Sequence, residues 1–215
     1  MDKDELQPAS SKLPSQAQPQ QVSVRMEQSG GGKQIAYVQN YKETKKTAVV
    51  MLLVADDDDD DTPEQVELDF SCYSLFVIAD ELFKGKYFVV PKDKAITEST
   101  PSDLMRLAYL TQECIDTVKT FPAIFASQNH SYARTDDGHR AFFGIVRNVE
   151  VKEDGIWIYF YKMRKVRQQT LNECTAAFGI DGTEFKNELD STHWSIKRIN
   201  VVEALNDNGH TITLI

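Results

Sequence analysis

The chain lacks most features that would assign it to a membrane or disulfide-bonded class. Its only cysteines, Cys72, Cys114 and Cys174, are far apart and odd in number, which suits neither a disulfide framework nor a paired-cysteine zinc site. The most apolar run, residues 48–55, is much shorter than the roughly 20 residues that a membrane helix needs. The residues after Met1 are charged, and no apolar segment of export-signal length follows them. We therefore expect a cytoplasmic protein without a membrane partner.

Sequence signatures of enzymes and cofactor-binding proteins are absent as well. The chain has no glycine-rich phosphate-binding loop, no dinucleotide-binding fingerprint and no repeat of fixed period. No Gly-x-Ser-x-Gly motif marks a hydrolase nucleophile. These absences favour a non-enzymatic protein that uses no cofactor.

The formal net charge of −9 disfavours general affinity for nucleic acids, but the charge is unevenly distributed. Six negative charges form the single run Asp56 to Asp61, and without them the net charge is −3. Because the run contains no glycine to turn the chain around a cation, we interpret it as a solvated loop, with a Ca²⁺ site as the alternative. Any basic patch must therefore be local.

Composition divides the chain into a tail and a domain. Residues 1–33 are rich in Gln, Ser and Pro and contain no aromatic residue, so they cannot bury enough apolar surface to offset the entropy of ordering. We predict a disordered polar tail there. Residues 34–215 are long enough and, at 41% hydrophobic residues for the whole chain, apolar enough for a single domain. The alternative is two lobes, residues 34–100 and 101–215.

The clearest structural signal is a β-hairpin at residues 142–163, where two strand-forming runs flank the turn-like segment 152–155. Gly144 allows a bulge of the kind found at the corners of small barrels. Both faces of the hairpin are apolar, so we expect one face to fill a core and the other to be covered. Further strands are predicted at residues 35–38, 47–54, 66–73, 75–79 and 86–90, with a helix at 74–83 as the alternative in that region.

Two main helices are predicted. Start signals at Thr100, Pro101 and Asp103, followed by an apolar stripe, indicate a helix over 101–119. A second helix is predicted over 165–178, with Gly179 as its stop. The polar segment that fills most of residues 123–140 has loop composition.

The C-terminal residues give mixed signals. Short strands are predicted at 183–189 and 192–199. The pair Asn208-Gly209 indicates a hairpin, whereas Asn200 with Glu203 fits a capping box and indicates a helical turn. Together the patterns predict an α+β fold, a β-rich domain with two main helices and a small, partly closed barrel in its C-terminal half.

The candidate binding site lies on the second strand of the hairpin and just beyond it. A basic cluster at the expected start of the second helix could hold an anion with the free backbone N–H groups. Aromatic residues on one face of the strand could stack single-stranded bases. The alternative is that the aromatic residues are core and the basic residues pair with carboxylates. The candidate residues are Trp157, Tyr159, Tyr161, Lys162, Arg164, Lys165 and Arg167.

Two further groups of side chains raise enzymatic alternatives. His130 and His139 flank Asp136 and Asp137, a composition that suits a metal or acid–base site as well as a surface loop. Residues 188–197 contain Asp, His and Ser, but a hydrolase needs these groups to meet in space. If the segment is a strand, Trp194 faces the core while His193 and Lys197 form a polar outer face. We predict no catalytic or metal residues.

The preferred function is a non-enzymatic binding or protein-interaction module, because the sequence offers apolar strand surface without a catalytic signature. Binding of single-stranded nucleic acid or another anion through the basic and aromatic residues is the first alternative. A metal-dependent or hydrolytic enzyme that uses the histidines is the second.

Overall fold

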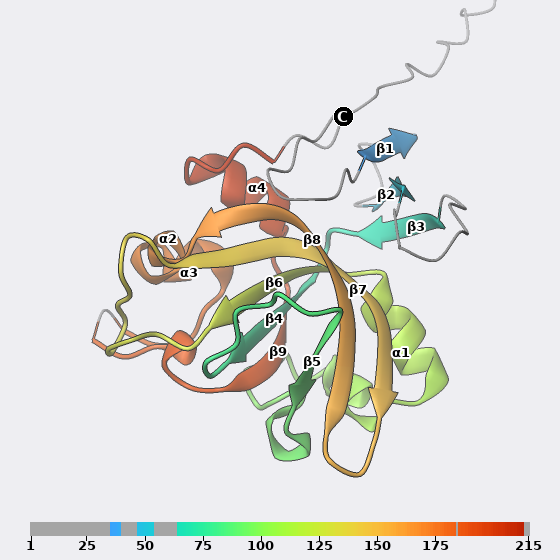
Figure 1. Ribbon diagram of the computed structural model, residues 1–215, viewed down its shortest axis with the longest axis horizontal. Helices are drawn as coiled ribbons and strands as arrows, with labels where there is room; N and C mark the ends of the chain where they lie inside the picture. Colours follow the sequence, from blue (N-terminus) through green and yellow to red (C-terminus); the bar gives the residue numbers. More distant parts are fainter. Residues whose placement is uncertain (1–34, 40–46, 54–63, 184, 213–215) are drawn as a thin grey trace, which may run out of the picture.

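The computed structural model describes the chain except residues 1–34, 40–46, 54–63, 184 and 213–215 (Figure 1). The predicted N-terminal tail and the run Asp56 to Asp61 lie outside the described residues. The described residues form an α+β fold with a three-stranded sheet, in the order β1-β2-β3, and a six-stranded sheet, in the order β5-β8-β7-β6-β4-β9. The predicted fold class is confirmed. The strands are β1 Ile35–Gln39, β2 Thr47–Leu53, β3 Glu64–Asp69, β4 Tyr73–Ile78, β5 Tyr87–Val90, β6 Pro122–Ser127, β7 Arg140–Val151, β8 Ile156–Arg167 and β9 His193–Lys197.

The six-stranded sheet curls into a partly closed barrel (Figure 1). Only the β4–β6 pair is parallel, and all other neighbours are antiparallel. The loop that follows β5 covers the outer edge of β9. In it, Thr97 N donates to Trp194 O at 2.9 Å, and Thr100 Oγ1 accepts from Ile196 N at 3.0 Å. These bonds satisfy backbone groups that an edge strand would otherwise leave unpaired.

The predicted hairpin is the β7–β8 pair. Its turn is closed by a 2.8 Å bond from Lys152 N to Gly155 O, with Gly155 at φ 154°. The predicted bulge at Gly144 is confirmed, because the strand register shifts between Phe143 and Gly144. A Cβ atom at Gly144 would lie 1.9 Å from Tyr161 O, so no other residue fits there without movement of the backbone. A second register shift follows Val146 and breaks the simple alternation expected along the strand.

Each face of the curled sheet carries its own core. The concave core contains an aromatic group in which Phe76 contacts Phe88, Phe125 and Trp194 at centroid distances of 4.9–5.6 Å. The convex core lies under the short C-terminal helices and includes Leu171, from the first of them. The helices are α1 Gln112–Lys119, α2 Gln168–Glu173, α3 Thr175–Phe178 and α4 Val201–Asp207, and the 3₁₀ helices are η1 Lys92–Lys94, η2 Met105–Tyr109 and η3 Glu188–Asp190. Within the described part of the chain, no helix is long and apolar enough to cross a bilayer.

The first predicted helix, 101–119, is wrong in its N-terminal half. Leu110 adopts φ 49° and ends η2, and Thr111 then caps the shorter α1 by accepting from Cys114 N. Thr100 caps no helix because its hydroxyl accepts from β9 instead. The apolar stripe of α1 nevertheless faces the core as predicted.

The second predicted helix starts too early. Residues expected to be helical extend β8, because Arg140 and Ala141 of β7 pair with Arg167 and Val166. The helix is also broken at Cys174 into α2 and α3, whereas Gly179, at φ 61°, ends α3 as predicted. Tertiary pairing outweighs local helix propensity here.

Several other local predictions need correction. The loop expected from residue 123 begins with the fully buried strand β6, and the alternative helix at 74–83 is the strand β4. The strand expected at 183–189 is a bridged turn followed by η3. At the C-terminus the helical turn is correct and the hairpin is wrong, because Asn200 caps α4 by accepting from the N–H groups of Val202 and Glu203.

Candidate binding surfaces

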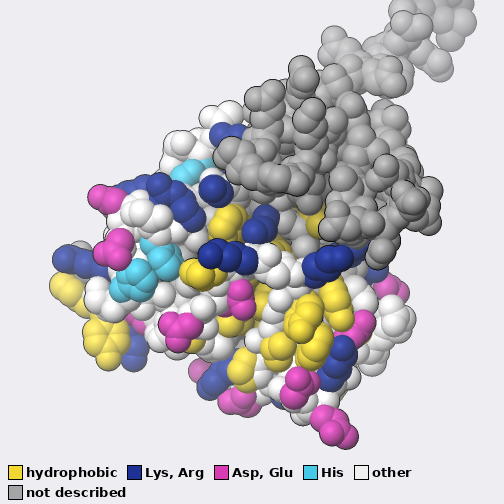
Figure 2. All heavy atoms as spheres, in the orientation of Figure 1, with side chains coloured by type: hydrophobic (Ala, Val, Ile, Leu, Met, Phe, Trp, Pro, Cys, Tyr) yellow, Lys and Arg dark blue, Asp and Glu magenta, His cyan; other side chains and the backbone are white. Residues whose placement is uncertain are grey.

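The three candidate aromatic residues of β8 do not share one environment. Tyr161 is only 9% exposed and belongs to the convex core, with Arg147 5.1 Å from its ring centre. Trp157 and Tyr159 lie near the turn, beyond the cover of the C-terminal helices, and are half-buried. Tyr87 of β5, which the sequence did not single out, joins them with 41% of its surface exposed. We call Tyr87, Trp157 and Tyr159 the aromatic face. Figure 2 shows a patch of hydrophobic side chains on the visible surface.

Contacts within the aromatic face leave little room for a stacked base. Tyr87 stacks on Trp157 with ring centres 4.1 Å apart and an interplanar angle of 16°. Lys152 follows β7 and approaches Trp157 from the side away from β5. Its Nζ lies 3.5 Å from the centre of the Trp157 ring. The indole Nε1 donates to Asp154 Oδ1 at 3.0 Å, and Tyr159 OH lies 3.3 Å from Glu150 Oε2. Both flat sides of the indole are therefore covered.

The aromatic face borders an edge strand. Lys86 O accepts from Phe160 N, and the register then directs the backbone groups of Phe88 and Val90 toward β8. The alternate residues Tyr87 and Val89 turn their N–H and C=O groups to the other side. Within the described residues no strand pairs with this side of β5.

The four candidate basic residues are separated by the course of β8. Lys162 points inward, donates to Phe83 O at 2.5 Å and lies 4.9 Å from the ring centre of Phe142. Burial, with help from the nearby charge of Lys165, lowers the pKa of Lys162, although Glu81 opposes this. Lys162 is therefore a half-buried group bound to the backbone of Phe83 rather than part of an open basic surface.

The remaining three residues lie at the end of β8, before α2 begins. Arg167 binds Asp137 at 2.7 Å and Glu173 at 2.9 Å. Arg164 and Lys165 are exposed and, being consecutive in a strand, point to opposite faces. The expected anion site at a helix start is not formed, because α2 begins only at Gln168 and is a single short turn.

Residues 188–197 form a buried polar cluster instead of the expected polar outer face. His193, Ser195 and Lys197 share one face of β9 as predicted, but all three are buried. Lys197 Nζ lies 2.7 Å from Glu188 Oε2 and 3.4 Å from Asp181 Oδ2. Glu188 Oε1 lies 3.2 Å from His193 Nε2 and 3.3 Å from Ser195 Oγ. We call these five residues the Glu188 cluster.

Electrostatics in the Glu188 cluster favour the ion pair. Burial raises the pKa of Glu188, but hydrogen bonds to His193 and Lys197 and the charge of Lys197 outweigh burial and lower the pKa to about 2. Burial of the ring, followed by the charge of the same carboxylate, raises the pKa of Tyr73, whose hydroxyl donates to Phe178 O at 2.7 Å. Glu188 is thus a fixed anion, which makes it a poor general base.

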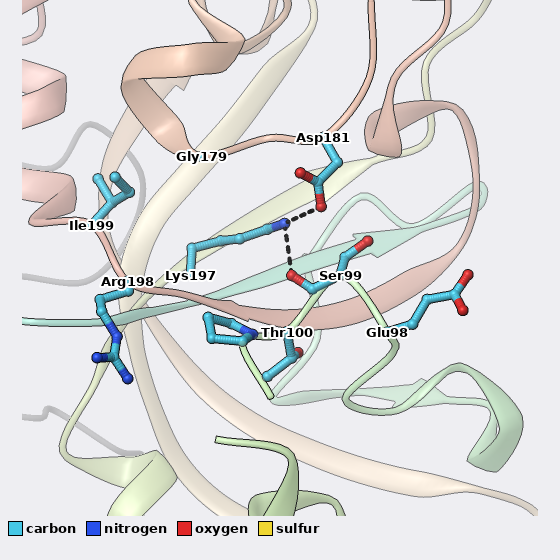
Figure 3. Close-up of a pocket in the computed structure, with 9 residues that line it drawn as sticks. Glu98, Ser99, Thr100, Gly179, Asp181, Lys197, Arg198 and Ile199 are labelled. Carbon is cyan, nitrogen blue, oxygen red and sulfur yellow. Dashed lines mark hydrogen bonds and ion pairs between the residues drawn. The ribbon is translucent and has the colours of Figure 1, made fainter. Parts of the chain in front are cut away.

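A pocket of about 340 Å³ adjoins the Glu188 cluster, and Lys197 lines it (Figure 3). The ammonium group of a lysine has three donor positions. The three donor positions of Lys197 face Glu188, Asp181 and, at 3.2 Å, the carbonyl oxygen of Ser99. No donor is left for a ligand in the pocket.

The Glu188 cluster does not form a hydrolase triad. His193 contacts Ser191 O at 2.9 Å and Glu188, and its ring has no hydrogen bond to Ser195. Asp190 is used elsewhere, because its carboxylate accepts from the backbone N–H groups of Ala133 and Asn187. Nothing in this arrangement activates the serine hydroxyl as a nucleophile.

The structure does bring His130 and His139 together. Their ring centres are 4.6 Å apart, and His130 Nδ1 lies 2.9 Å from Asp136 Oδ2. Burial, followed by the charge of His130, lowers the pKa of His139. Among the described residues, however, no group of three or more His, Cys, Asp or Glu side chains is arranged to hold a metal ion. The pair therefore offers no support for a metal-dependent enzyme.

No protein-family model matches the chain, and neither the curated proteins nor the solved structures contain a match to it. Sequence reasoning missed Tyr87, which joins the aromatic face only through strand pairing, and Arg140, which lies beside Arg167 for the same reason. Arg140 could have been found by continuing the hairpin register from the turn, since it pairs with Arg167.

Proposed function

We propose that the chain is a non-enzymatic binding module that takes up an extended segment of a protein partner along the free edge of β5. The observation that carries this proposal is the aromatic face beside β5, whose outer edge pairs with no strand of the described residues. Backbone groups of Tyr87 and Val89 would pair with the segment, and its alternate side chains would contact Tyr87, Trp157 and Tyr159. Addition of a strand to an exposed sheet edge is a recurring mode of peptide recognition.

The chemistry around the aromatic face favours a polypeptide over a nucleobase. Lys152 and Tyr87 cover the flat sides of Trp157, whereas 41% of the surface of Tyr87 remains exposed. The border carries both signs of charge, with Lys152, Glu150 and Asp154. Aromatic centres with polar rims are typical of protein interfaces.

Selection from a library of random peptides on the full chain tests the proposal. We expect enriched peptides with alternating apolar residues, because only alternate side chains of an added strand face the aromatic face. Binding should slow amide exchange at Tyr87 and Val89. N-methylation of alternate peptide bonds in an enriched peptide should weaken binding at least tenfold, since it removes backbone donors.

Two variants separate the aromatic face from general stickiness. Trp157→Ala with Tyr159→Ser should abolish enrichment of these peptides, and Tyr109→Ser with Tyr132→Ser should leave it unchanged, since those tyrosines are exposed elsewhere at 81% and 70%. Equal enrichment by both double variants would contradict the proposal. Light scattering provides a further check, because a dimer that the first double variant dissociates would assign the face to a second copy of the chain.

A further inference from the structure

Two histidines lie side by side on the segment that joins β6 to β7. His130 and His139 have ring centres 4.6 Å apart and an interplanar angle of 76°. We call them the histidine pair. Figure 2 shows histidine side chains in adjoining positions on the visible surface. Neither residue belongs to the aromatic face or to the Glu188 cluster, so this site is independent of the proposed peptide-binding edge.

Each ring of the histidine pair keeps one nitrogen available. His130 Nδ1 lies 2.9 Å from Asp136 Oδ2, and the other ring nitrogen, Nε2, has no hydrogen bond with a described residue. A carboxylate on one nitrogen fixes the proton there and leaves the lone pair on the other, as in many metal-ligating histidines. His139 Nε2 is buried and has no hydrogen-bond partner within the described part of the chain. Because buried polar atoms are nearly always bonded, this nitrogen marks a place where a bound group can supply the contact.

The spacing of the two rings fits one metal ion bound by both. Metal–nitrogen distances of about 2.0–2.1 Å place the centres of two bound imidazoles about 4.5 Å apart at a right angle and about 5.2 Å apart at the tetrahedral angle. The observed 4.6 Å agrees with the right angle. Neighbouring ligands at a right angle are typical of square-planar and tetragonal sites, which Cu²⁺ and Ni²⁺ prefer.

The backbone on both sides of the histidine pair is held in place. Beside His130, the side-chain amide of Asn129 donates to Asp190 Oδ1 at 2.8 Å. At the other end of the segment, His139 O accepts from the backbone N–H of Gln168, the first residue of α2, at 3.3 Å. Because both ends are fixed, binding of an ion costs little ordering of the chain.

The charges near the histidine pair favour a cation that binds nitrogen rather than oxygen. Asp136 pairs with no Lys or Arg among the described residues, whereas Asp137 is bound by Arg167. The guanidinium group of Arg140 opposes the charge of Asp136, because it donates to His139 O at 3.1 Å. One free carboxylate offers too few oxygen ligands for Ca²⁺ or Mg²⁺. Imidazole nitrogens instead suit copper, nickel and zinc.

We propose that the histidine pair binds one divalent late transition-metal ion, Cu²⁺ in preference to Ni²⁺, through His130 Nε2 and His139 Nε2. Affinity generally rises from Ni²⁺ to Cu²⁺, which sets the expected order. Asp136 is a positioning residue, because it orients the His130 ring without binding the metal. Only two protein ligands take part, so water completes the coordination and a chelator removes the ion.

Titration of the chelator-treated full chain with Cu²⁺, followed by electron paramagnetic resonance, tests this inference. We expect the first equivalent to give a tetragonal spectrum with hyperfine splitting from two nitrogens. A large excess of Ca²⁺ or Mg²⁺ should not displace this ion, because both prefer oxygen ligands. A first equivalent with oxygen ligands only, as the run Asp56 to Asp61 would give, would overturn the proposal. Displacement by Ca²⁺ would overturn it as well.

Matched histidine variants locate the ion. His130→Gln and His139→Gln should each weaken Cu²⁺ binding by about tenfold or more, since even partners of metal ligands contribute about 10–100-fold. Each variant should also remove one nitrogen from the spectrum. The His130 side chain is 52% exposed, so the first variant keeps the fold. His210→Gln removes a histidine beside Thr170 and should change affinity less than about twofold. Equal losses in all three variants would overturn the site.

Neighbouring carboxylates separate positioning from binding. Asp136→Asn should weaken Cu²⁺ binding by about tenfold, while the spectrum keeps both nitrogens. Asp137→Asn removes the same charge from the next residue and should have a much smaller effect, because Asp137 is bound by Arg167. Equal losses in both variants would reduce the effect to net charge and contradict the role of Asp136. Peptide binding at β5 should be unchanged in all of these variants, since the two sites share no residue.

Discussion

The Glu188 cluster and the hairpin surface carry similar chemical groups in opposite states. In the Glu188 cluster, Lys197 uses all three donor positions on protein acceptors, and Glu188 is held by both Lys197 and His193. On the hairpin, Arg164 and Lys165 bind no described carboxylate, and the outer side of β5 pairs with no described strand. The charged groups of the Glu188 cluster bind each other, whereas the hairpin has side chains and a strand edge that remain available to a partner.

This difference shows that a concentration of reactive residue types is a poor guide to a functional site. Residues 188–197 combine Glu, Asp, Ser, Thr, His and Lys, yet the carboxylate of Glu188 and the ammonium group of Lys197 bind each other within the fold. The hairpin residues look ordinary in sequence but leave donors and aromatic surface available. Unused capacity, rather than residue type, therefore points to function here.

The largest expected effect comes from breaking the buried ion pair. Lys197→Met should lower the free energy of unfolding by about 3–5 kcal/mol, because it leaves the Glu188 carboxylate buried without a cation. Arg167→Met breaks an exposed pair and should lower the free energy of unfolding far less. Urea unfolding followed by circular dichroism measures both. Similar losses would mean that the two regions do not differ in the way described.

Acid titration examines the same cluster without a change of size. The pKa of Glu188 is lowered to about 2 from an ordinary 4.5, so the carboxylate stabilises the fold above about pH 4.5 and loses this contribution as the pH falls toward 2. The shift corresponds to about 3 kcal/mol. Glu188→Gln should therefore be about 3 kcal/mol less stable than the parent near neutral pH, and the difference should vanish near pH 2. A difference independent of pH would assign the loss to packing.

A smaller effect is expected from Trp157→Ala, which removes the stack with Tyr87. We expect a loss of about 1 kcal/mol, since a surface aromatic pair contributes little beyond its partial burial. Trp194→Ala serves as the contrast, because this residue is fully buried against Phe76 and its truncation should cost about 3–5 kcal/mol. Chemical unfolding monitored by circular dichroism avoids dependence on tryptophan fluorescence. Equal costs would mean that the aromatic face is structural.

The smallest effect on stability is expected at the exposed cations of β8. Arg164→Gln with Lys165→Gln should change the free energy of unfolding by less than about 0.5 kcal/mol, because neither side chain has a described ion-pair partner to lose. Urea unfolding followed by circular dichroism measures the change. A loss comparable to that of Lys197→Met would remove the distinction between the two regions.

Strong local patterns in the sequence predicted much of the fold. The turn at 152–155 and the stop at Gly179 were correct, because each depends on the backbone freedom of glycine near its own position. The irregularity at Gly144 was correct too, because only a residue without a side chain fits so close to the neighbouring strand. The prediction that Trp194 faces the core was also correct, because side chains alternate between the two faces of a strand. The early start of the second helix was wrong, because pairing of β8 with Arg140 and Ala141 is not visible locally.

The sites were harder to predict than the fold. Tyr161 and Trp157 lie on the same face of one strand. Tyr161 is in the core and Trp157 at the surface only because the helices cover one end of that face and not the other. Tyr87 lies about 70 residues from Trp157 in sequence, so their stack arises from strand order alone. Burial of Lys197 depends on Glu188 and Asp181, which η3 and the preceding turn bring over β9.

The loop that covers β9 also limits how the chain can assemble. Open-ended growth of a sheet from identical subunits requires two free edges, one to offer and one to receive. Hydrogen bonds with Thr97 and Thr100 occupy the β9 edge, so among the described residues the six-stranded sheet has one free edge, at β5. Such a unit can accept one strand or close with a second copy, but it cannot propagate a fibril through this sheet.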